Sequence, residues 1–236
     1  MTLHLIFGEA ALELVPRTIS NHPSILAHAR RKGKKPSEIL LDVSYHYAAM
    51  KALEHLGKRG RPDITHFSVL EALSSPLNKE GQLETWIHTL QDFVIQVEPG
   101  TRIPRNYERF VGLIEQLFKE RKVPSRGKPL LQMNPSTIEA LIERIQPTKL
   151  VALSTLGRPS TLERICRSLA ETPRPAVIVG CFARGHFSNR TAKLAHEVFS
   201  VDREPLDSWV VTSRVIYEYE RTVSLPQRRL PSPDSR

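Results

Sequence analysis

The amino-acid sequence predicts an α/β protein in which a parallel sheet is covered by helices. The main observation lies in the last third of the chain, where an apolar run at residues 150–153, a helical pattern over 161–169 and a second apolar run at 176–179 follow one another. Strands that alternate with helices are typical of parallel sheets. Composition is the second observation: 236 residues with 40% hydrophobic and 25% charged side chains fit one large or two small globular domains. A wholly disordered or fibrous chain is thereby excluded.

Two strands and a helix are expected near the N-terminus. Residues 2–7 are rich in large apolar side chains, and Gly8 is expected to end this first strand. The apolar run at residues 39–43 predicts a second, buried strand. A helix over residues 46–56 follows it, with Gly57 as its end.

The middle of the chain predicts a small inserted lobe at about residues 58–100. Turn-forming residues dominate its beginning, and two strand-like runs at 84–90 and 93–97 follow, joined by two polar residues. Residues 1–223, with this lobe inserted, are expected to form a single domain, and we find no internal repeat.

Three further helices are predicted from periodicity and capping. The clearest has an apolar stripe at helical spacing and begins after Asn106, which is placed to cap it. Its stripe consists of Phe110, Leu113, Ile114, Leu117 and Phe118. The next helix is expected over residues 135–145, with Asn134 as its cap and a proline at its first position. The last is expected over residues 208–220.

The chain is strongly basic, with 34 Lys and Arg against 25 Asp and Glu and a formal net charge of +9. This balance makes a nucleic acid a natural partner, although many basic proteins bind no anion. Residues 30–35 carry a cluster of basic side chains that is either a solvated loop or a phosphate contact. Residues 224–236, with three prolines and three arginines, are expected to form a flexible basic tail.

Several classes of protein are disfavoured. The longest apolar run, residues 176–183, is far shorter than the roughly 18 residues of a membrane span. The N-terminus has no basic leader and reaches Glu9 early, so a cytoplasmic protein without a secretory signal is expected. Cys166 and Cys181 lie in no metal-binding pattern, which favours two reduced thiols and no metal site.

Two loops that follow predicted strands are candidate ligand sites, residues 154–159 and the loop that begins at Gly180. Ligands on open α/β sheets bind beyond the carboxyl ends of the strands. Gly180 and Gly185 have no β-carbon and allow a ligand close to the backbone. Their spacing matches a P-loop, but His186 and Phe187 replace the Lys-Ser/Thr pair, so ATP hydrolysis is disfavoured. A dinucleotide fingerprint is also absent. The alternative is a pair of ordinary turn glycines.

The tripeptide Arg61-Pro62-Asp63 is a candidate binding element. Proline favours an extended conformation for the residue before it, and an aspartate two residues after an arginine can orient the guanidinium toward a partner. An ordinary surface ion pair has the same sequence pattern, so the spacing alone leaves both interpretations open.

Arg102, Arg105 and Arg109 follow one another at i, i+3 and i+7 and lead into the helix with the Phe110 stripe. Planar guanidinium groups on a rigid support suit phosphate better than mobile lysines do. A solvated helix face is the alternative.

These stretches together resemble the Nep/Emg family of ribosome-biogenesis proteins, the SPOUT-class pseudouridine N(1)-methyltransferases of small-subunit ribosomal RNA. The resemblance spans nearly the whole chain. It rests on residues 40–46 (LLDVSYH), 61–67 (RPDITHF), 75–81 (SPLNKEG) and 102–107 (RIPRNY), and on the Gly180 loop with Pro205-Leu206 beyond it. It implies a SPOUT α/β fold with a C-terminal trefoil knot, a small inserted lobe and a homodimer.

The resemblance also implies a role for individual residues. Arg61 would grip a flipped nucleotide with support from Asp63, and both are the expected catalytic residues. RNA contacts of a small-subunit ribosomal RNA hairpin map onto Arg61, Arg102, Arg105 and Arg109. The S-adenosyl-L-methionine pocket maps onto Leu153, Gly180, Gly185, His186, Phe187, Val201, Asp202, Arg203, Glu204, Pro205 and Leu206. The charged run 201–204 is expected to contribute mainly backbone contacts.

The reaction that the resemblance implies is an in-line displacement in which a pseudouridine ring nitrogen attacks the methyl group of the cofactor. Most of the catalysis would then be positioning of a base taken out of its stack. No general base is identified, because an aspartate already paired with an arginine is a weak base. Two rival functions share the same features: an RNA-binding assembly factor without turnover, and a methyltransferase of the same fold that acts on tRNA.

Overall fold

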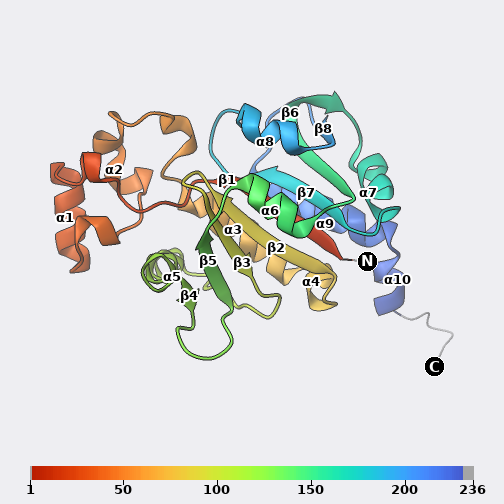
Figure 1. The fold of residues 1–236 in the computed structure, drawn as a ribbon, viewed down its shortest axis with the longest axis horizontal. Coiled ribbons are helices and arrows are strands. Elements are labelled where there is room, and N and C mark those ends of the chain that lie inside the picture. The colour runs from red at the N-terminus through yellow and green to blue at the C-terminus, as the bar shows by residue number, and fades with distance from the viewer. Residues whose placement is uncertain (1, 231–236) are drawn as a thin grey trace.

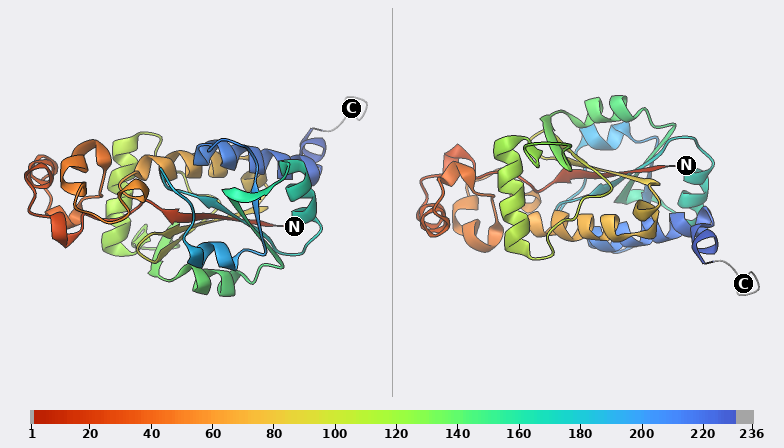
Figure 2. Two further views of the ribbon diagram at one scale, coloured as in Figure 1. Left: turned by 90° about the horizontal axis from the view of Figure 1, so that it is seen from above. Right: turned by 90° about the horizontal axis from the view of Figure 1, so that it is seen from below.

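The α/β prediction is confirmed in a computed structural model that describes residues 2–230. An eight-stranded sheet in the order β4-β5-β3-β2-β1-β7-β6-β8 is covered by helices on both faces (Figures 1 and 2). The strands are β1 (Leu3–Ala10), β2 (Leu83–Thr89), β3 (Phe93–Val97), β4 (Lys122–Val123), β5 (Leu131–Pro135), β6 (Lys149–Pro159), β7 (Pro175–Gly180) and β8 (Glu197–Ser200). The helices are α1 (Pro23–Lys32), α2 (Val43–Met50), α3 (Pro62–Ser74), α4 (Pro76–Lys79), α5 (Tyr107–Glu120), α6 (Ile138–Ile145), α7 (Leu162–Ala170), α8 (Asn189–Leu194), α9 (Ser208–Thr222) and α10 (Leu225–Arg229).

The sheet is mixed, with a parallel part and an antiparallel part. Strands β2, β1, β7, β6 and β8 run parallel, whereas β3, β5 and β4 pair antiparallel at one edge. Helices α3, α7 and α9 cover one face and α6 and α8 the other, as both views of Figure 2 show. Helix α5 stands across the end of the sheet and packs its apolar side chains into the core under α3 and α9. The expected trefoil knot stays a prediction of the family resemblance.

Alternating side chains divide the core between the two faces. In β1, Leu5 and Phe7 belong to the cluster under α3 and α9, while Ile6 between them belongs to the cluster under α6. The same division recurs in β7, where Val177 and Ile178 point to opposite faces. Both strands are buried on both faces, and β7 is a continuous apolar run, which is the pattern that predicted it. Strand β1 was predicted from its large apolar residues, but it also contains His4 and Glu9.

Six predicted elements are confirmed within a few residues. Helix α5 carries the expected stripe, and the Asn106 side chain accepts a hydrogen bond from the amide of Arg109. Helix α7 is capped by Thr161, and α9 and β7 also lie where the periodicity placed them. The two strand-like runs of the middle section are β2 and β3.

The lobe of this protein is not the expected one. Residues 58–100 contain α3 and two strands of the central sheet, with β2 paired parallel to β1, so the prediction of an inserted lobe there was wrong. A separate small core is formed instead by residues 15–56, which include Ile25, Leu41 and Met50. This segment and the four residues after it are here called the N-terminal lobe (residues 15–60). The lobe projects from the sheet beside α5 (Figure 1).

Three local predictions inside the N-terminal lobe and at its entrance were also wrong. The run at residues 39–43 forms only an isolated bridge between Leu14 and Leu40, because no neighbouring strand is available to pair with it. Asp42 instead caps α2, which therefore starts three residues before the expected position and ends at Met50. The first strand continues past Gly8 to Ala10.

Two later boundaries also differ from the prediction. Asn134 and Pro135 belong to β5, and α6 starts at Ile138 with Thr137 as its cap. The expected tail begins with helix α10, whose Leu225 is buried in the core, so residues 225–229 are not a flexible tail. Residues 231–236 of that prediction lie outside the described residues. None of the described helices is long and apolar enough to cross a membrane.

The N-terminal lobe is attached to α5 by a buried carboxylate. Glu115 accepts hydrogen bonds from Lys34 at 2.6 Å, from Lys32 at 3.2 Å and from the amide of Leu40 at 3.0 Å. Burial alone would raise the pKa of Glu115, but these hydrogen bonds and the lysine charges lower it below its ordinary value. Two of the five basic residues in the cluster at residues 30–35, Lys32 and Lys34, are therefore engaged in holding the lobe.

We expect the contribution of Glu115 to vanish in acid. Its folded pKa is lowered, so its stabilisation is present above its ordinary pKa of 4.5 and is lost as the pH falls through the lowered value. At pH 7, Glu115→Gln should lower the free energy of unfolding by about 3 kcal/mol, because two lysines lose their buried partner. Thermal unfolding between pH 7 and pH 3 should show this gap closing. The exposed pair variant Glu163→Gln is the control, and a gap that does not change with pH would contradict the assignment.

Candidate active site

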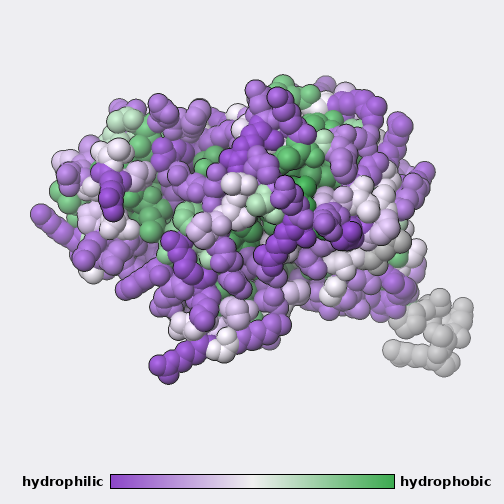
Figure 3. Space-filling model, viewed as in Figure 1, coloured by the Kyte–Doolittle hydropathy of each residue, from purple (hydrophilic) through white to green (hydrophobic). Residues whose placement is uncertain are grey.

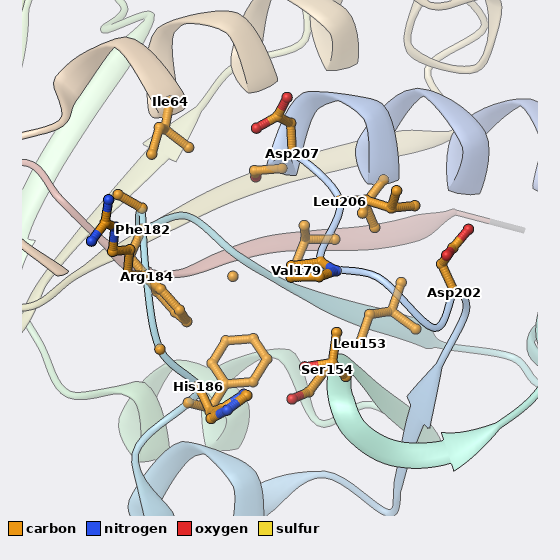
Figure 4. Close-up of a pocket in the computed structure, with 18 of the residues that line it drawn as sticks. Ile64, Leu153, Ser154, Val179, Phe182, Arg184, His186, Asp202, Leu206 and Asp207 are labelled. Carbon is orange, nitrogen blue, oxygen red and sulfur yellow. The ribbon is translucent and has the colours of Figure 1, made fainter. Parts of the chain in front are cut away.

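A cavity of about 460 Å³ lies at the carboxyl end of β7 and beside residues 153–155 of β6, in the region where the sequence placed a ligand site. Its volume is in the range of small-molecule sites. Figure 4 shows Phe182 and His186 on one wall, Leu206 on another, and Ile64 with Asp207 above them. The cavity is built mainly by residues 153–155 of β6 and by the loops that follow β7 and β8.

The structure brings together most of the residues expected to bind the cofactor. Those that line the cavity are Leu153, Gly180, Gly185, His186, Phe187, Val201, Asp202, Glu204, Pro205 and Leu206. Arg203 is exposed and is not among the lining residues. The backbone between 201 and 204 is held locally, since Ser200 donates to the Asp202 carbonyl and the Glu204 amide donates to the Asp202 carboxylate.

The loop of residues 181–187, here called the pocket loop, leaves the sheet beside β1. Its first residue exchanges hydrogen bonds with β1, from Cys181 N to Gly8 O at 3.0 Å and from Ala11 N to Cys181 O at 3.1 Å. Gly185 has φ of +92°, a conformation that strains any other residue. Of the two glycines in the predicted pattern, Gly185 is therefore required by the backbone conformation of this loop. The rings of Phe182 and Phe187 pack edge to face, 5.7 Å apart.

The residues after Leu153 extend a strand, where the sequence suggested a loop. Strand β6 continues to Pro159 with an irregular register between Leu153 and Arg158 against β8. At Gly157 a β-carbon would lie 2.5 Å from the backbone carbon of Phe199, so only glycine allows β6 and β8 to approach here. Ser154 and Thr155 line the cavity at this bend.

Sequence reasoning missed several lining residues, chiefly on α3 and on α9. Ile64 and Trp209 contribute from these helices, and Asp207 lies at the start of α9 without capping it through its side chain. Periodicity could not reveal them, because their place depends on how two distant helices pack at the sheet end. The only local signal was a polar Asp207-Ser208 pair in front of a predicted helix.

Arg61 opens into the same cavity and is held by Asp63, as the spacing suggested. The guanidinium donates from Nε to Oδ1 at 2.8 Å and from Nη2 to Oδ2 at 2.7 Å. The hydrogen bonds to Asp63 raise the pKa of Arg61 above its ordinary value. Both oxygens of Asp63 are engaged, and the remaining Nη1 group of Arg61 is left for a ligand.

Arg102, Arg105 and Arg109 are all exposed, but only Arg109 belongs to a helix. The first two lie in the segment before α5, so the i, i+3, i+7 helical spacing is not the reason for their common exposure. Within residues 2–230 none of these three side chains forms an ion pair, in contrast to Lys32 and Lys34. Hydrophilic residues also dominate the face of the molecule seen in Figure 3, including the end that carries α5.

The two thiols are buried and free, as expected. Burial raises the pKa of Cys181 to about 11 and that of Cys166 to about 12. Neither thiol is therefore a nucleophile at neutral pH. Among the described residues no group of three or more His, Cys, Asp or Glu side chains is arranged to hold a metal ion.

A helix-covered α/β sheet with a cavity beyond its strands, and an oriented arginine in that cavity, is typical of enzymes that bind a small ligand. The chain belongs to the EMG1/NEP1 methyltransferase family, because residues 5–220 match the sequence pattern of that family. It is 45% identical over 224 residues to a ribosomal RNA small subunit methyltransferase Nep1 from Staphylothermus marinus, covering 94% of this chain and 97% of that protein. A protein of the same name from Thermococcus kodakarensis is 44% identical over 226 residues, covering 94% and 100%.

A solved structure shows the same fold. The crystal structure of Archaeoglobus fulgidus Nep1 bound to S-adenosylhomocysteine matches with a TM-score of 0.85 and 38% sequence identity, and the match covers 95% of this chain and 100% of that chain. The similarity includes the N-terminal lobe, since it spans almost the whole length of both proteins.

Proposed function

We propose that this protein transfers a methyl group from S-adenosyl-L-methionine to the N(1) ring nitrogen of a pseudouridine in small-subunit ribosomal RNA. One observation carries the proposal: Arg61, oriented by Asp63, opens into the same cavity as the pocket loop. A nucleotide held by the arginine and a methyl donor held by the loop would thus be neighbours. The named relatives and the S-adenosylhomocysteine bound to Archaeoglobus fulgidus Nep1 agree with this assignment.

The lining of the cavity fits such a cofactor. The rings of Phe182, Phe187 and Trp209 and the side chain of Leu206 offer apolar surface to a flat adenine. The carboxylates of Asp202 and Asp207 favour a positively charged ligand. At Gly185 the absence of a side chain leaves the backbone accessible. The cofactor supplies a methyl group on a sulfonium sulfur, ready for in-line displacement.

The protein's own contribution is positioning. Arg61 can bind a base edge or a flanking phosphate with the guanidinium face that Asp63 leaves open, and its orientation is fixed before the RNA arrives. Asp63 is a poor candidate for the general base, because both its oxygens accept hydrogen bonds from Arg61. Arg102, Arg105 and Arg109 would bind phosphates of the same hairpin outside the cavity. Because ribosomal RNA is the proposed substrate, we expect the protein to act in the cytoplasm.

Mass spectrometry of a short small-subunit rRNA hairpin tests the proposal. The hairpin is prepared with uridine or with pseudouridine at one position and incubated with the protein and labelled S-adenosyl-L-methionine. We expect methyl on the pseudouridine hairpin only. Methyl on both hairpins would contradict the proposed chemistry, and tight binding without methyl on either would favour an RNA-binding assembly factor. A tRNA substrate in parallel tests the third possibility.

Arg61 and Asp63 should act as one unit. We expect Arg61→Ala to lower turnover on the pseudouridine hairpin about 100-fold, because a misplaced nucleotide loses its alignment. Asp63→Ala should lower turnover by less than Arg61→Ala does, and the double variant should be little worse than Arg61→Ala alone. The exposed pair Glu163 and Arg167, with a comparable ion pair at 2.8 Å, provides the matched control. Additive losses would mean that Asp63 has a separate role in proton removal.

The three arginines beside α5 should supply RNA affinity but no cofactor affinity. Each phosphate contact with a single strand contributes a slope of about 0.7 in log affinity against log salt, so the triple alanine variant should flatten the slope by roughly 2. A fluorescent hairpin titrated at several salt concentrations measures it. Removal of three exposed arginines around α7, Arg164, Arg167 and Arg174, is the charge-matched control. An unchanged slope, or an equal loss in the control, would contradict the assignment.

A homodimer is the further expectation, and α3 with α9 offers its surface. Phe67 is 48% exposed and Tyr217 is 59% exposed, and the ring of Phe67 packs against Trp209 of α9 at 5.3 Å. Exposed aromatic residues on two helices that pack against each other are typical of an interface. We expect sedimentation to show a dimer, and Phe67→Asp with Tyr217→Asp to shift it to a folded monomer. A monomeric wild-type protein would contradict this proposal.

A further inference from the structure

Glu9 occupies an unusual position at the end of β1, next to the cavity but not in its wall. It is 4% exposed and has φ of +53°, in the left-handed region. The register of β1 against β2 is irregular at this point, passing from the pair Phe7 and Ile87 to the pair Ala10 and Thr89. Such backbone strain persists only where surrounding contacts hold it, and it clusters at functional sites. The side chain of Glu9 is therefore expected to make contacts that offset the strain.

One oxygen of Glu9 holds the far end of the pocket loop. Oε1 accepts a hydrogen bond from the amide of Ser188 at 2.8 Å and another from the hydroxyl of Thr191 at 2.7 Å. Ser188 directly follows the pocket loop and caps α8. The loop is thus attached to β1 at both ends, through backbone hydrogen bonds at Cys181 and through the Glu9 carboxylate at Ser188.

The second oxygen of Glu9 binds Lys58, which comes from the segment before Arg61. The Lys58 ammonium lies 2.5 Å from Oε2 of Glu9 and 4.5 Å from the centroid of the Phe182 ring. A β-carbon at Gly185 would lie 3.6 Å from the Lys58 side chain. Gly57, the residue before Lys58, adds a backbone contact, because its carbonyl accepts a hydrogen bond from the amide of Arg184 at 3.0 Å. Lys58 and its neighbour thus lie along the back of the pocket loop.

Glu9 and Lys58 form a buried ion pair. Burial alone would raise the pKa of Glu9, but hydrogen bonds from Lys58, Ser188 and Thr191 outweigh it and lower the pKa, so the carboxylate is ionised. A buried ion pair adds little net stability compared with an apolar pair of the same size, whereas removal of one partner leaves an uncompensated charge. Neither Glu9 nor Lys58 lines the cavity. Their contacts instead connect the pocket loop with the segment that carries Arg61.

We propose that Glu9 and Lys58 are positioning residues that fix the pocket loop in its ligand-binding conformation and tie it to the segment that carries Arg61. The inference rests on the proposed function, since it assigns these residues to the cofactor side of that site. Lys58 acts through Phe182 and the loop backbone. Cofactor affinity should therefore depend on a lysine that does not touch the cofactor.

A second ion pair in the same region provides a matched control. Arg59, the next residue, donates to Glu13 from Nε at 2.7 Å and from Nη2 at 2.6 Å. The two pairs are equally buried: the side chains of Lys58 and Glu9 are 17% and 5% exposed, and those of Arg59 and Glu13 are 14% and 3% exposed. Both pairs connect the end of the N-terminal lobe with the chain around β1. The side chains of Arg59 and Glu13 form no hydrogen bond with the pocket loop within the described residues.

Lys58→Met and Arg59→Met separate positioning from stability. Calorimetry with S-adenosylhomocysteine and thermal unfolding are measured on both variants and on the wild-type protein. We expect similar decreases in the midpoint of thermal unfolding, but a rise in the dissociation constant of at least tenfold for Lys58→Met alone. Lys58→Arg should recover most of the affinity, because it keeps the charge opposite Glu9. On the pseudouridine hairpin, Lys58→Met should raise the KM for the methyl donor and leave kcat at saturation within about threefold.

Each other outcome has a definite meaning. Affinity within twofold of wild type in Lys58→Met, or an equal loss in Arg59→Met, overturns the inference, because general loosening would then explain the effect. If Lys58→Met does not fold, Glu9→Gln gives the same comparison while keeping the size of the side chain, and wild-type affinity in that variant overturns the inference. A wild-type protein that does not bind S-adenosylhomocysteine contradicts the proposed function itself, and the inference falls with it.

Discussion

The parallel pairing of β7 with β1 on one side and β6 on the other determines where everything else in this protein can lie. The register places Gly8 opposite Gly180 and Leu153 opposite Val179, so the three strands run level with one another up to the point where β7 ends. Strand β7 leaves the sheet there, whereas β1 continues to Ala10 beside β2 and β6 continues to Pro159 beside β8. The loop after β7 and the bend of β6 at residues 153–155 therefore form a cavity at that edge, and the amide and carbonyl of Cys181 are satisfied by Gly8 and Ala11.

Three buried carboxylates attach the N-terminal lobe and its end to the rest of this basic protein. Glu9, Glu13 and Glu115 are each less than 5% exposed, and each binds a lysine or arginine from the N-terminal lobe or its end. These pairs use up part of the positive charge near the sheet. The arginines around the start of α5 form no ion pair in the described structure, so their charge is displayed on the exposed surface. The same ion-pair arrangement that attaches the lobe thereby separates structural cations from cations available to a polyanion.

The sequence predicted those elements in which local pattern and tertiary environment agree. Helices α5 and α7 have an apolar stripe and a capping side chain, and both were found. Helix α3 was missed, because it buries Thr65, His66 and Ser68 along with its apolar residues and so shows no stripe. The apolar residues at 39–41 were buried as expected, but they lack a strand to pair with and remain extended coil. Burial can be predicted from composition, whereas pairing depends on what the rest of the chain brings alongside.

The candidate site divides in the same way. Gly180, Gly185 and Arg61 carry a local signal, because a loop after a buried strand and an Arg-x-Asp spacing each restrict what the residues can do. Arg102 and Arg105 were correctly placed on the surface for the wrong reason, since they precede the helix. Glu9 and Lys58 carry no sequence signal at all: a glutamate near the end of a strand and a lysine in a basic segment are ordinary in isolation. Their importance exists only in three dimensions, where β1 lies beside the pocket loop and the end of the lobe crosses behind it. In this fold, the lining residues that follow a strand were predicted from local motifs, whereas the lining residues on α3 and α9 and the residues that hold the pocket loop in place become visible only once the sheet has brought the segments together.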